Sequence, residues 1–308
     1  MKDGLIIIDK PAGWTSHDAV ARLRKILKTT KIGHTGTLDP FATGVLVMLV
    51  GKATRLARFL HSDEKEYEAV LRFGFETDTG DATGERRMFD ELQFVGSDKL
   101  KHVGQMSESD ISAVLPEFRG EIEQVPPMYS AKKIGGKRLY KMAREGKEVE
   151  REPVTVTISR IECTGEISSG EGTKDFGLNV VCSAGTYVRT LAEDIGRKLD
   201  IGCHLAELRR TRAGRFSLDQ AHTLEELAEF DPSAVKLIPM SKAVVHLPSI
   251  TLTEAELQMV HHGRRFEGSE RDVFGEGEFA LLTADGRLAA IGEEDAETGE
   301  ISPKLVMI

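Results

Sequence analysis

The spacing of hydrophobic and polar residues predicts a chain in which strands and helices are mixed. Apolar and polar residues alternate with a period of two, typical of strands, at 67–73, 155–161 and 175–183. Short apolar runs at 5–8 and 45–50 indicate two more strands. Apolar residues recur at helical spacing, three or four apart, at 17–27, 53–60, 111–115, 186–199, 224–230 and 253–262.

Local residues predict where several of these elements begin and end. Ser16 is expected to cap the helix over 17–27, and Ser109 the short helix that Pro116 would end. A glycine-rich stretch at 165–172 indicates a turn between two strands. In the hairpin expected at 281–291, Asp285 and Gly286 suit a two-residue type I′ turn.

The length of 308 residues, 40% of them hydrophobic, allows one large domain and one small domain, each with its own core. A linker-like segment, IPMSKAVVHLPSI, follows the helix predicted at 224–230. We therefore expect one domain over 1–247 and a small mixed β domain over 248–308. Residues 86–105 match no motif and are expected to be a variable insertion.

Composition excludes several classes of protein. No stretch reaches the ~20 apolar residues of a membrane span, and the start MKDGLIIIDKP has too short an apolar core for a secretory signal. A cytoplasmic protein without membrane contact is expected. Cys163, Cys182 and Cys203 are widely spaced without a CxxC pair, so neither a disulfide framework nor a zinc site is indicated. We expect them to be small buried apolar residues.

The net charge of −9 at pH 7 argues, taken alone, against a nucleic-acid partner. Its distribution weakens that argument, because acidic residues gather at 268–300 whereas 132–144 and 209–215 are locally basic. The sequence is therefore compatible with a cationic face on an acidic body, although a charge run is more often a solvated surface.

The stretch at 33–44, GHTGTLDPFATG, has the composition of a loop that presents side chains. Pro40 disfavours a helical conformation at Asp39 and so holds its carboxylate out just before the next strand. Asp39 is the first candidate for a catalytic residue. On spacing alone, an ordinary Asp-Pro turn remains the alternative.

Two other loops resemble ligand-binding motifs without fulfilling them. In GVLVMLVGKAT, Gly44 stands too far before Gly51 for a phosphate-binding P-loop, and Ala53 occupies the position that needs Ser or Thr. In TDTGDATGE, Gly80 and Ala82 stand where calcium ligands are required. Neither site is predicted.

Several motifs together resemble one family. The segments GHTGTLDPFATGVL, QVPPMYSAKKIGGKRLYKMAREG, GTYVRTLAEDIG and HLAELRRTRAG are similar to those of the tRNA pseudouridine synthases that modify uridine 55 in the TΨC loop. Phe41 departs from the family pattern, in which Leu is expected. The resemblance implies an α+β fold with a mixed, largely antiparallel central sheet flanked by helices. It also implies a thumb-like RNA-binding insertion at about 124–152 and a C-terminal PUA-like RNA-binding domain.

The resemblance implies catalytic roles for three residues. Asp39 would be the essential carboxylate, and Arg189 would pair with it and hold it ionised, since a fixed cation favours the charged form. The ring of Tyr67 would stack on the uracil, and its hydroxyl would accept the C5 proton in the last step.

Further residues are implied to bind the substrate. His34 would take the place of the flipped base in the RNA, Tyr187 would pack under that base, and Leu208 would line the uracil pocket. Asp81 would be a partner for a catalytic cation, and Lys132 and Arg144 would meet phosphates.

The activity implied is the isomerisation of uridine to pseudouridine in tRNA, by a monomer that needs no metal and no small-molecule cofactor. Two alternatives stay open. An N-glycosidic hydrolase would also use Asp39 but would normally need a second carboxylate. A non-catalytic RNA-binding or chaperone protein would need only the basic thumb and the terminal module. Product analysis separates these alternatives.

Overall fold

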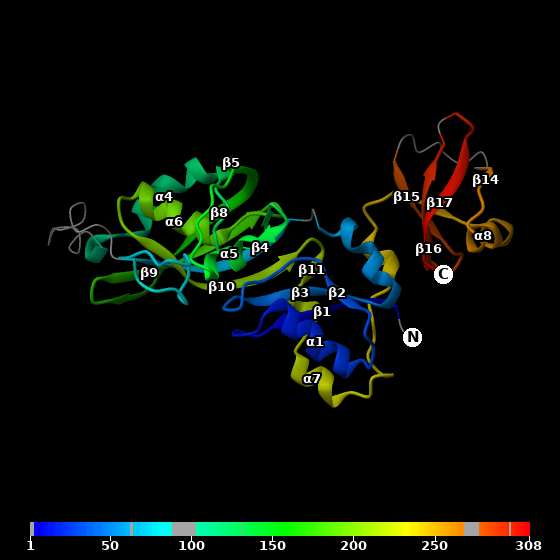
Figure 1. Ribbon diagram of the computed structural model, residues 1–308, viewed down its shortest axis with the longest axis horizontal. Helices are drawn as coiled ribbons and strands as arrows, with labels where there is room; N and C mark the ends of the chain where they lie inside the picture. The colour runs from blue at the N-terminus through cyan, green and yellow to red at the C-terminus, as the bar shows by residue number, and fades with distance from the viewer. Residues whose placement is uncertain (1–2, 62–63, 88–102, 131, 268–276, 296) are drawn as a thin grey trace.

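The computed structural model of the chain describes residues 3–61, 64–87, 103–130, 132–267, 277–295 and 297–308. They form a large sheet with helices on it and a separate smaller sheet at the C-terminal end (Figure 1). Most of the insertion expected at 86–105 lies outside the described residues. The mixed, α+β character predicted from the sequence is confirmed.

The large sheet has the strand order β12-β1-β3-β10-β4-β9-β8-β5, with β2 paired to β3 and β11 to β10. Its neighbours run antiparallel except β1 with β12 and β3 with β10, so the expected largely antiparallel sheet is confirmed. The bounds are β1 Gly4–Lys10, β2 Ile32–His34, β3 Thr43–Val50, β4 Lys65–Phe73, β5 Gly120–Gln124, β8 Val154–Gly170, β9 Thr173–Cys182, β10 Cys203–Ala213, β11 Phe216–Ser217 and β12 Ala221–His222.

Helices cover one face of this sheet and bury its main core. These are α1 Ser16–Ile26, α4 Glu108–Val114, α6 Val188–Lys198 and α7 Leu224–Glu229. Their apolar stripes, such as Leu23 and Leu191, pack on strand residues such as Met48 and Leu71, all at most 1% exposed. Four 3₁₀ segments complete the body: η1 Gly51–Phe59, η2 Leu115–Phe118, η3 Leu218–Gln220 and η4 Met240–Ala243.

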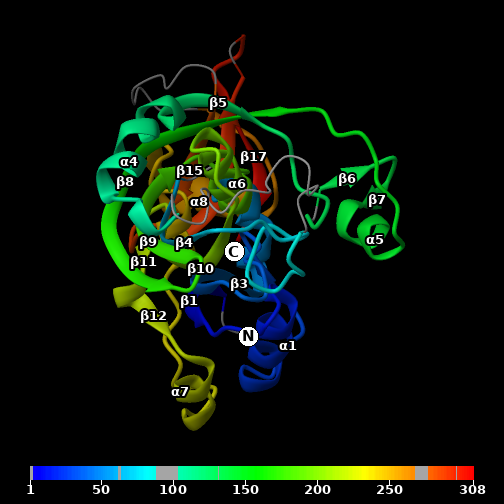
Figure 2. The same ribbon diagram turned by 90° about the vertical axis from the view of Figure 1, so that its left-hand side faces the viewer.

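The segment between β5 and β8 stands to one side of the large sheet (Figure 2). It contains β6 Lys133–Ile134, β7 Lys137–Arg138 and α5 Leu139–Arg144. Leu139 and Met142 are buried, whereas the cationic side chains of Lys137, Arg138 and Arg144 are exposed. We call residues 124–152 the thumb.

The C-terminal sheet is a curled β sheet in the order β13-β15-β16-β17-β14, as expected for a PUA-like module. It comprises β13 Ser249–Thr251, β14 Phe266–Glu267, β15 Glu278–Leu282, β16 Leu288–Glu294 and β17 Glu300–Val306, with α8 Glu254–His261. One apolar cluster joins the two sheets, because Leu56 and Phe59 of η1 share it with Ile291 and Met307.

Two predicted helix caps are wrong by one or two residues. Thr15, not Ser16, caps α1: its hydroxyl accepts from Asp18 N, and the Asp18 carboxylate accepts from Thr15 N. Ser16 instead bonds both the N–H and the carbonyl of Leu38. Ser107, not Ser109, caps α4, because Asp110 completes its capping box. Helix α4 ends at Val114, just before Pro116 as expected, and the chain continues as η2, whose first turn tolerates proline.

Two predicted turns are also wrong in their extent. Strand β8 runs on to Gly170, because Gly165, at φ +102°, lies at a bulge rather than in a turn. The hairpin of β15 and β16 exists, but its loop spans 283–287. Only Gly286 in it has positive φ, whereas a type I′ turn needs two such residues.

Cys182 and Cys203 are buried as expected, and Cys163 is half-buried. Of the described helices, none is long and apolar enough to cross a membrane. Within the described ranges, no three His, Cys, Asp or Glu side chains are grouped so that they could hold a metal ion.

Strands β3 and β10 meet at Gly44, where the loop of Asp39 enters the sheet. Gly44 has φ +99°, and a Cβ built on it would lie 2.2 Å from the carbonyl oxygen of Arg210. Only glycine permits this approach of two backbones. Gly13, in the neighbouring loop, also has positive φ (+80°) but faces open space.

We expect Gly44→Ala to lower the free energy of unfolding by about 3 kcal/mol, because it adds a backbone clash to the strain of positive φ. Gly13→Ala, the matched control, carries only the strain and should cost about 1 kcal/mol. Urea unfolding of both variants measures the difference. Equal losses would contradict the role assigned to the close approach at Gly44.

Candidate active site

The loop that carries Asp39 is fixed from below by the connection between β1 and α1. Lys10 is fully buried, and its ammonium donates to the carbonyls of Trp14 (2.7 Å), Pro11 (2.9 Å) and Pro40 (3.3 Å). Burial lowers the pKa of Lys10 to about 8, although the nearby Asp39 carboxylate opposes this. The backbone next to Asp39 is therefore held by a buried cation.

Arg189, in the first turn of α6, reaches Asp39 from the opposite side. Its Nε lies 2.9 Å from Asp39 Oδ2, while Nη1 donates to Thr79 O at 2.9 Å and Nη2 to Tyr129 O at 2.8 Å. The residue is 4% exposed. Each of the three guanidinium nitrogens thus has a partner. Together they connect the loop of Asp39, the turn at 77–85 and the base of the thumb.

Asp81 lies behind Arg189 and does not line the cavity described below. Its Oδ2 is 3.5 Å from Arg189 Nη1. Its Oδ1 accepts from Thr79 Oγ1 and from Thr83 N, both at 2.9 Å. The carboxylate therefore closes its own turn and contacts the cation, so it acts as a support for Arg189 and not as a group that reaches substrate.

Asp39 is half-buried, with 35% of its side chain exposed. Burial raises the pKa of Asp39 above its ordinary value. The Arg189 guanidinium opposes this shift, and the Asp81 carboxylate adds to it. The expectation from the sequence is that Arg189 holds Asp39 ionised. Arg189 does favour the ionised form, but desolvation of the carboxylate outweighs it.

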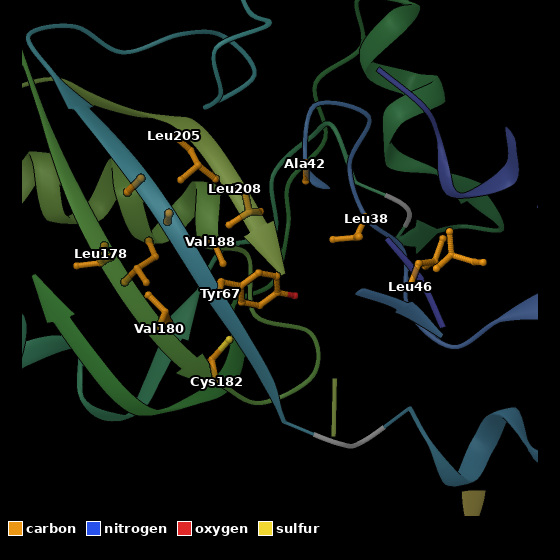
Figure 3. Packing of buried hydrophobic residues seen from close by; sticks show 14 of the residues in the cluster. Leu38, Ala42, Leu46, Tyr67, Leu178, Val180, Cys182, Val188, Leu205 and Leu208 are labelled. Atoms are coloured by element: carbon orange, nitrogen blue, oxygen red, sulfur yellow. The ribbon is translucent and has the colours of Figure 1, made fainter. Parts of the chain in front are cut away.

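A cavity of about 240 Å³ opens in front of Asp39. Tyr67 of β4 and Leu208 of β10 form part of its wall, on the sheet face that carries Leu205 (Figure 3). The ring of Tyr67 lies near Leu208 and Val188, with its hydroxyl turned toward the side where Leu38 lies (Figure 3). This part of the wall is thus apolar and aromatic, and it lies beside one carboxylate.

Arg210 supports this wall from within the protein. It is 2% exposed, and its guanidinium donates to Val45 O (2.7 Å) and Gly36 O (3.2 Å) and contacts the Tyr67 hydroxyl. Burial raises the pKa of Tyr67, while Arg210 opposes the shift. The phenol is therefore protonated at neutral pH in the resting protein.

Tyr187 lines the cavity, and His34 does not. Tyr187 precedes α6 and is held by Gln124, which accepts from its N–H at 3.0 Å and donates to its carbonyl at 3.3 Å. His34 ends β2, with its ring 6.0 Å from that of His17. Burial lowers the pKa of His34 to about 4, so the imidazole is neutral at pH 7.

Lys132 and Arg144 lie on the thumb and outside the cavity wall. The guanidinium of Arg144 lies 5.7 Å from the ring centroid of Tyr140, and that of Arg138 lies 5.9 Å from it. The structure therefore brings Asp39, Arg189, Tyr67, Tyr187 and Leu208 together at one cavity, places Asp81 behind it, and leaves His34, Lys132 and Arg144 apart from it.

Sequence reasoning missed the buried cations Lys10 and Arg210. A signal existed for Arg210: side chains of a strand alternate between faces, so Arg209 and Arg210 in β10 must point to opposite sides. Arg209 pairs with Asp9 (2.7 Å) and Arg212 with Glu66 (2.9 Å), so the basic run at 209–215 is largely neutralised and is not a free cationic face.

Two family models match this chain. The model described as TruB family pseudouridylate synthase (N terminal domain) matches residues 24–188. The model described as tRNA pseudouridylate synthase B C-terminal domain matches residues 189–243. The two matches are contiguous and include every residue discussed at the cavity except Lys10 and its neighbours.

Curated relatives match over almost the whole length. The chain is 42% identical over 298 residues to tRNA pseudouridine synthase B of Bacillus velezensis, which covers 96% of this chain and 91% of that protein. It is 44% identical over 288 residues to tRNA pseudouridine synthase B of Mycobacteroides abscessus. This match covers 94% of this chain and 91% of that protein.

Solved structures are similar in fold. One is a chain of an H/ACA RNP bound to a substrate RNA containing 2'-deoxyuridine, with a TM-score of 0.66 at 27% identity. The match covers 99% of this chain and 85% of that chain. A chain of a Cbf5-Nop10-Gar1 complex has a TM-score of 0.65 at 30% identity. The match covers 98% of this chain and 82% of that chain.

We expect the carboxyl of Asp39 to titrate above its ordinary pKa of 3.8, because burial disfavours the charged form. Arg189→Gln should raise this pKa further, since it removes the cation that opposes the shift. Arg197 lies on the same helix and pairs with Glu193 and Asp194, away from Asp39. Arg197→Gln should therefore leave the pKa of Asp39 unchanged. NMR titration of the carboxyl carbon measures all three. A lower pKa in Arg189→Gln would contradict this account.

Proposed function

The chain belongs to the TruB family of pseudouridylate synthases and is an isomerase that converts uridine to pseudouridine in tRNA, and from this premise we propose that its target is uridine 55 in the TΨC loop. One observation supports the assignment of the chemistry to this site. Of the described residues that line the cavity, Asp39 is the only carboxylate, and Arg189 contacts it directly.

The reaction exchanges one glycosidic bond for another within a single nucleotide. The C1′–N1 bond breaks, the uracil turns, and C5 bonds to C1′, while N1 gains a proton and C5 loses one. No atom leaves and no electron is transferred. We propose that Asp39 acts on the sugar or the base, either as nucleophile or by stabilising positive charge on the sugar as it develops, as carboxylates do in glycosidases.

The target base must leave its stack to reach Asp39. We propose that it enters the cavity of about 240 Å³, with Tyr67 and Tyr187 offering aromatic faces and Leu208 an apolar edge. The neutral imidazole of His34, beside but outside the cavity, is suited to fill the gap left in the RNA, since an uncharged ring can stack among bases.

The thumb and the C-terminal sheet are proposed to hold the rest of the RNA. Half-buried Lys132 and exposed Lys137 and Arg144 carry positive charge on a protein whose net charge is −9, and so can contact phosphates. We propose domain limits of 1–247 and 248–308, since the C-terminal sheet begins at Ser249. We propose a monomer in the cytoplasm, where a tRNA substrate is found.

The two alternatives have less support. An N-glycosidic hydrolase would normally use a second carboxylate, and Asp81, the nearest one to Arg189 besides Asp39, is engaged in its own turn. An RNA chaperone without catalysis would have no use for a desolvated Asp39 beside Arg189, because burying charge is costly.

We expect Asp39→Asn to form no detectable pseudouridine while its tRNA Kd stays within about tenfold of wild type, since phosphate contacts supply most of the affinity. Asp9→Asn is a matched control, because Asp9 also pairs with an arginine but lies outside the cavity. Pseudouridine mapping on an unmodified tRNA transcript is the measurement. Product at another position would contradict the proposed target, and product from Asp39→Asn would contradict the catalytic role.

Tyr67 has two proposed tasks that different substitutions separate. Tyr67→Leu removes the aromatic face, worth roughly 1–3 kcal/mol of base stacking, and should impair every step after base capture. Tyr67→Phe keeps the face and removes the hydroxyl that Arg210 contacts. If that oxygen gives its own proton to the base, where N1 gains one, and then accepts the C5 proton, the single-turnover rate should fall by about 10² or more. Normal rates in the Phe variant would limit Tyr67 to stacking.

A further inference from the structure

The hydroxyl of Ser130 is buried and has no hydrogen-bond partner among the residues that the structure describes. Ser130 is 5% exposed, and its Oγ belongs to the few buried side-chain atoms without a partner. A hydroxyl removed from water without compensation costs free energy. Because native proteins satisfy most such groups, an unsatisfied one calls for a reason.

Ser130 also belongs to the wall of the cavity in front of Asp39. Of the described wall residues, it alone has a buried polar side-chain atom without a partner. Two other wall hydroxyls are engaged: Thr186 Oγ1 donates to Ser183 O at 2.9 Å, and Ser183 Oγ accepts from Thr157 N at 2.9 Å. The Ser130 hydroxyl is therefore available to hydrogen-bond a ligand in the cavity.

The backbone around Ser130 is fixed from two directions. Arg189 Nη2 donates to the carbonyl of Tyr129 at 2.8 Å, and Tyr140 N donates to the carbonyl of Ser130 at 3.1 Å. The covered Oγ can therefore change its position by rotation about the Cα–Cβ bond, among three staggered orientations, without a backbone movement.

The ligand of the proposed reaction makes particular demands on such a group. The edge of uracil remote from the ribose carries an N3–H donor between two carbonyl acceptors. When the ring turns between bond cleavage and re-attachment, the kind of atom that faces a given wall residue changes. A serine hydroxyl both donates and accepts, so it can bond either kind, whereas a backbone N–H or carbonyl can bond only one.

We propose that the Ser130 hydroxyl hydrogen-bonds the imide edge of the flipped uracil and retains a bond to the ring as it turns. This rests on the proposed function of the same cavity. Ser130 is then the residue through which the thumb contacts the base itself, in addition to any contacts that its lysines and arginines make with phosphates.

Ser130→Ala should reduce the single-turnover rate of pseudouridine formation about tenfold, the effect of one hydrogen bond, with tRNA Kd changed less than twofold. Its melting temperature without RNA should not fall, because the substitution removes a group that has no partner. Thr190→Val is the matched control: Thr190 is 6% exposed, its Oγ1 also lacks a partner among the described residues, and it does not line the cavity. It should keep the wild-type rate within twofold.

A wild-type rate in Ser130→Ala, or an equal loss in Thr190→Val, would overturn the proposal. A loss of rate that follows a lowered melting temperature would also overturn it. If Ser130→Ala does not fold, Ser130→Cys replaces it, since the thiol is a weak donor and acceptor of similar size. A wild-type protein that forms no pseudouridine would instead refute the proposed function, so the two failures are distinguishable.

Discussion

The guanidinium of Arg189 binds three segments that are far apart in the sequence, and the geometry of the cavity depends on it. It contacts the carboxylate of Asp39, the carbonyl of Thr79 and the carbonyl of Tyr129. Each donor has a different partner, so a shift of any one segment breaks a bond to a buried charge, which is costly. The loop, the turn at 77–85 and the thumb are therefore positioned together, and Asp81 stabilises the arginine from behind.

The same contact sets the electrostatics of the site. Burial raises the pKa of Asp39, and the Arg189 cation acts against this shift by favouring the ionised form. Lys10 adds a second, fully buried positive charge beneath the loop. The cations of Lys10, Arg189 and Arg210 outnumber the carboxylates of Asp39 and Asp81, so the local charge differs in sign from the net charge of the chain, −9. An acidic protein can in this way offer an anionic RNA a favourable place to dock its reacting nucleotide.

Period-two and helical spacing predicted β1, β3, β4, β8 and β9 and the four helices on the large sheet, but not β10 at its centre or the short strands β2, β5, β11 and β12. The motifs pointed to Asp39 and Arg189. What the sequence could not supply were partners that only the tertiary structure provides. Ser16 could not be excluded as a cap, because its true partner, Leu38, lies 22 residues away. Arg210 was taken as part of a surface run, since the carbonyls of Gly36 and Val45 that satisfy it come from another segment. Short-range signals find elements, whereas buried polar contacts depend on which elements meet.

The apolar cluster shared by η1 and the C-terminal sheet has a consequence for how this protein varies in evolution. Leu56 of η1 is fully buried in it together with Ile291, and η1 leads within two residues to His61 at the cavity wall. Substitutions on η1 and on β16 must therefore stay compatible in size and shape. The C-terminal sheet is accordingly not an interchangeable appendage, and grafting the corresponding module of a relative onto this chain would require the facing residues of η1 to be transferred with it.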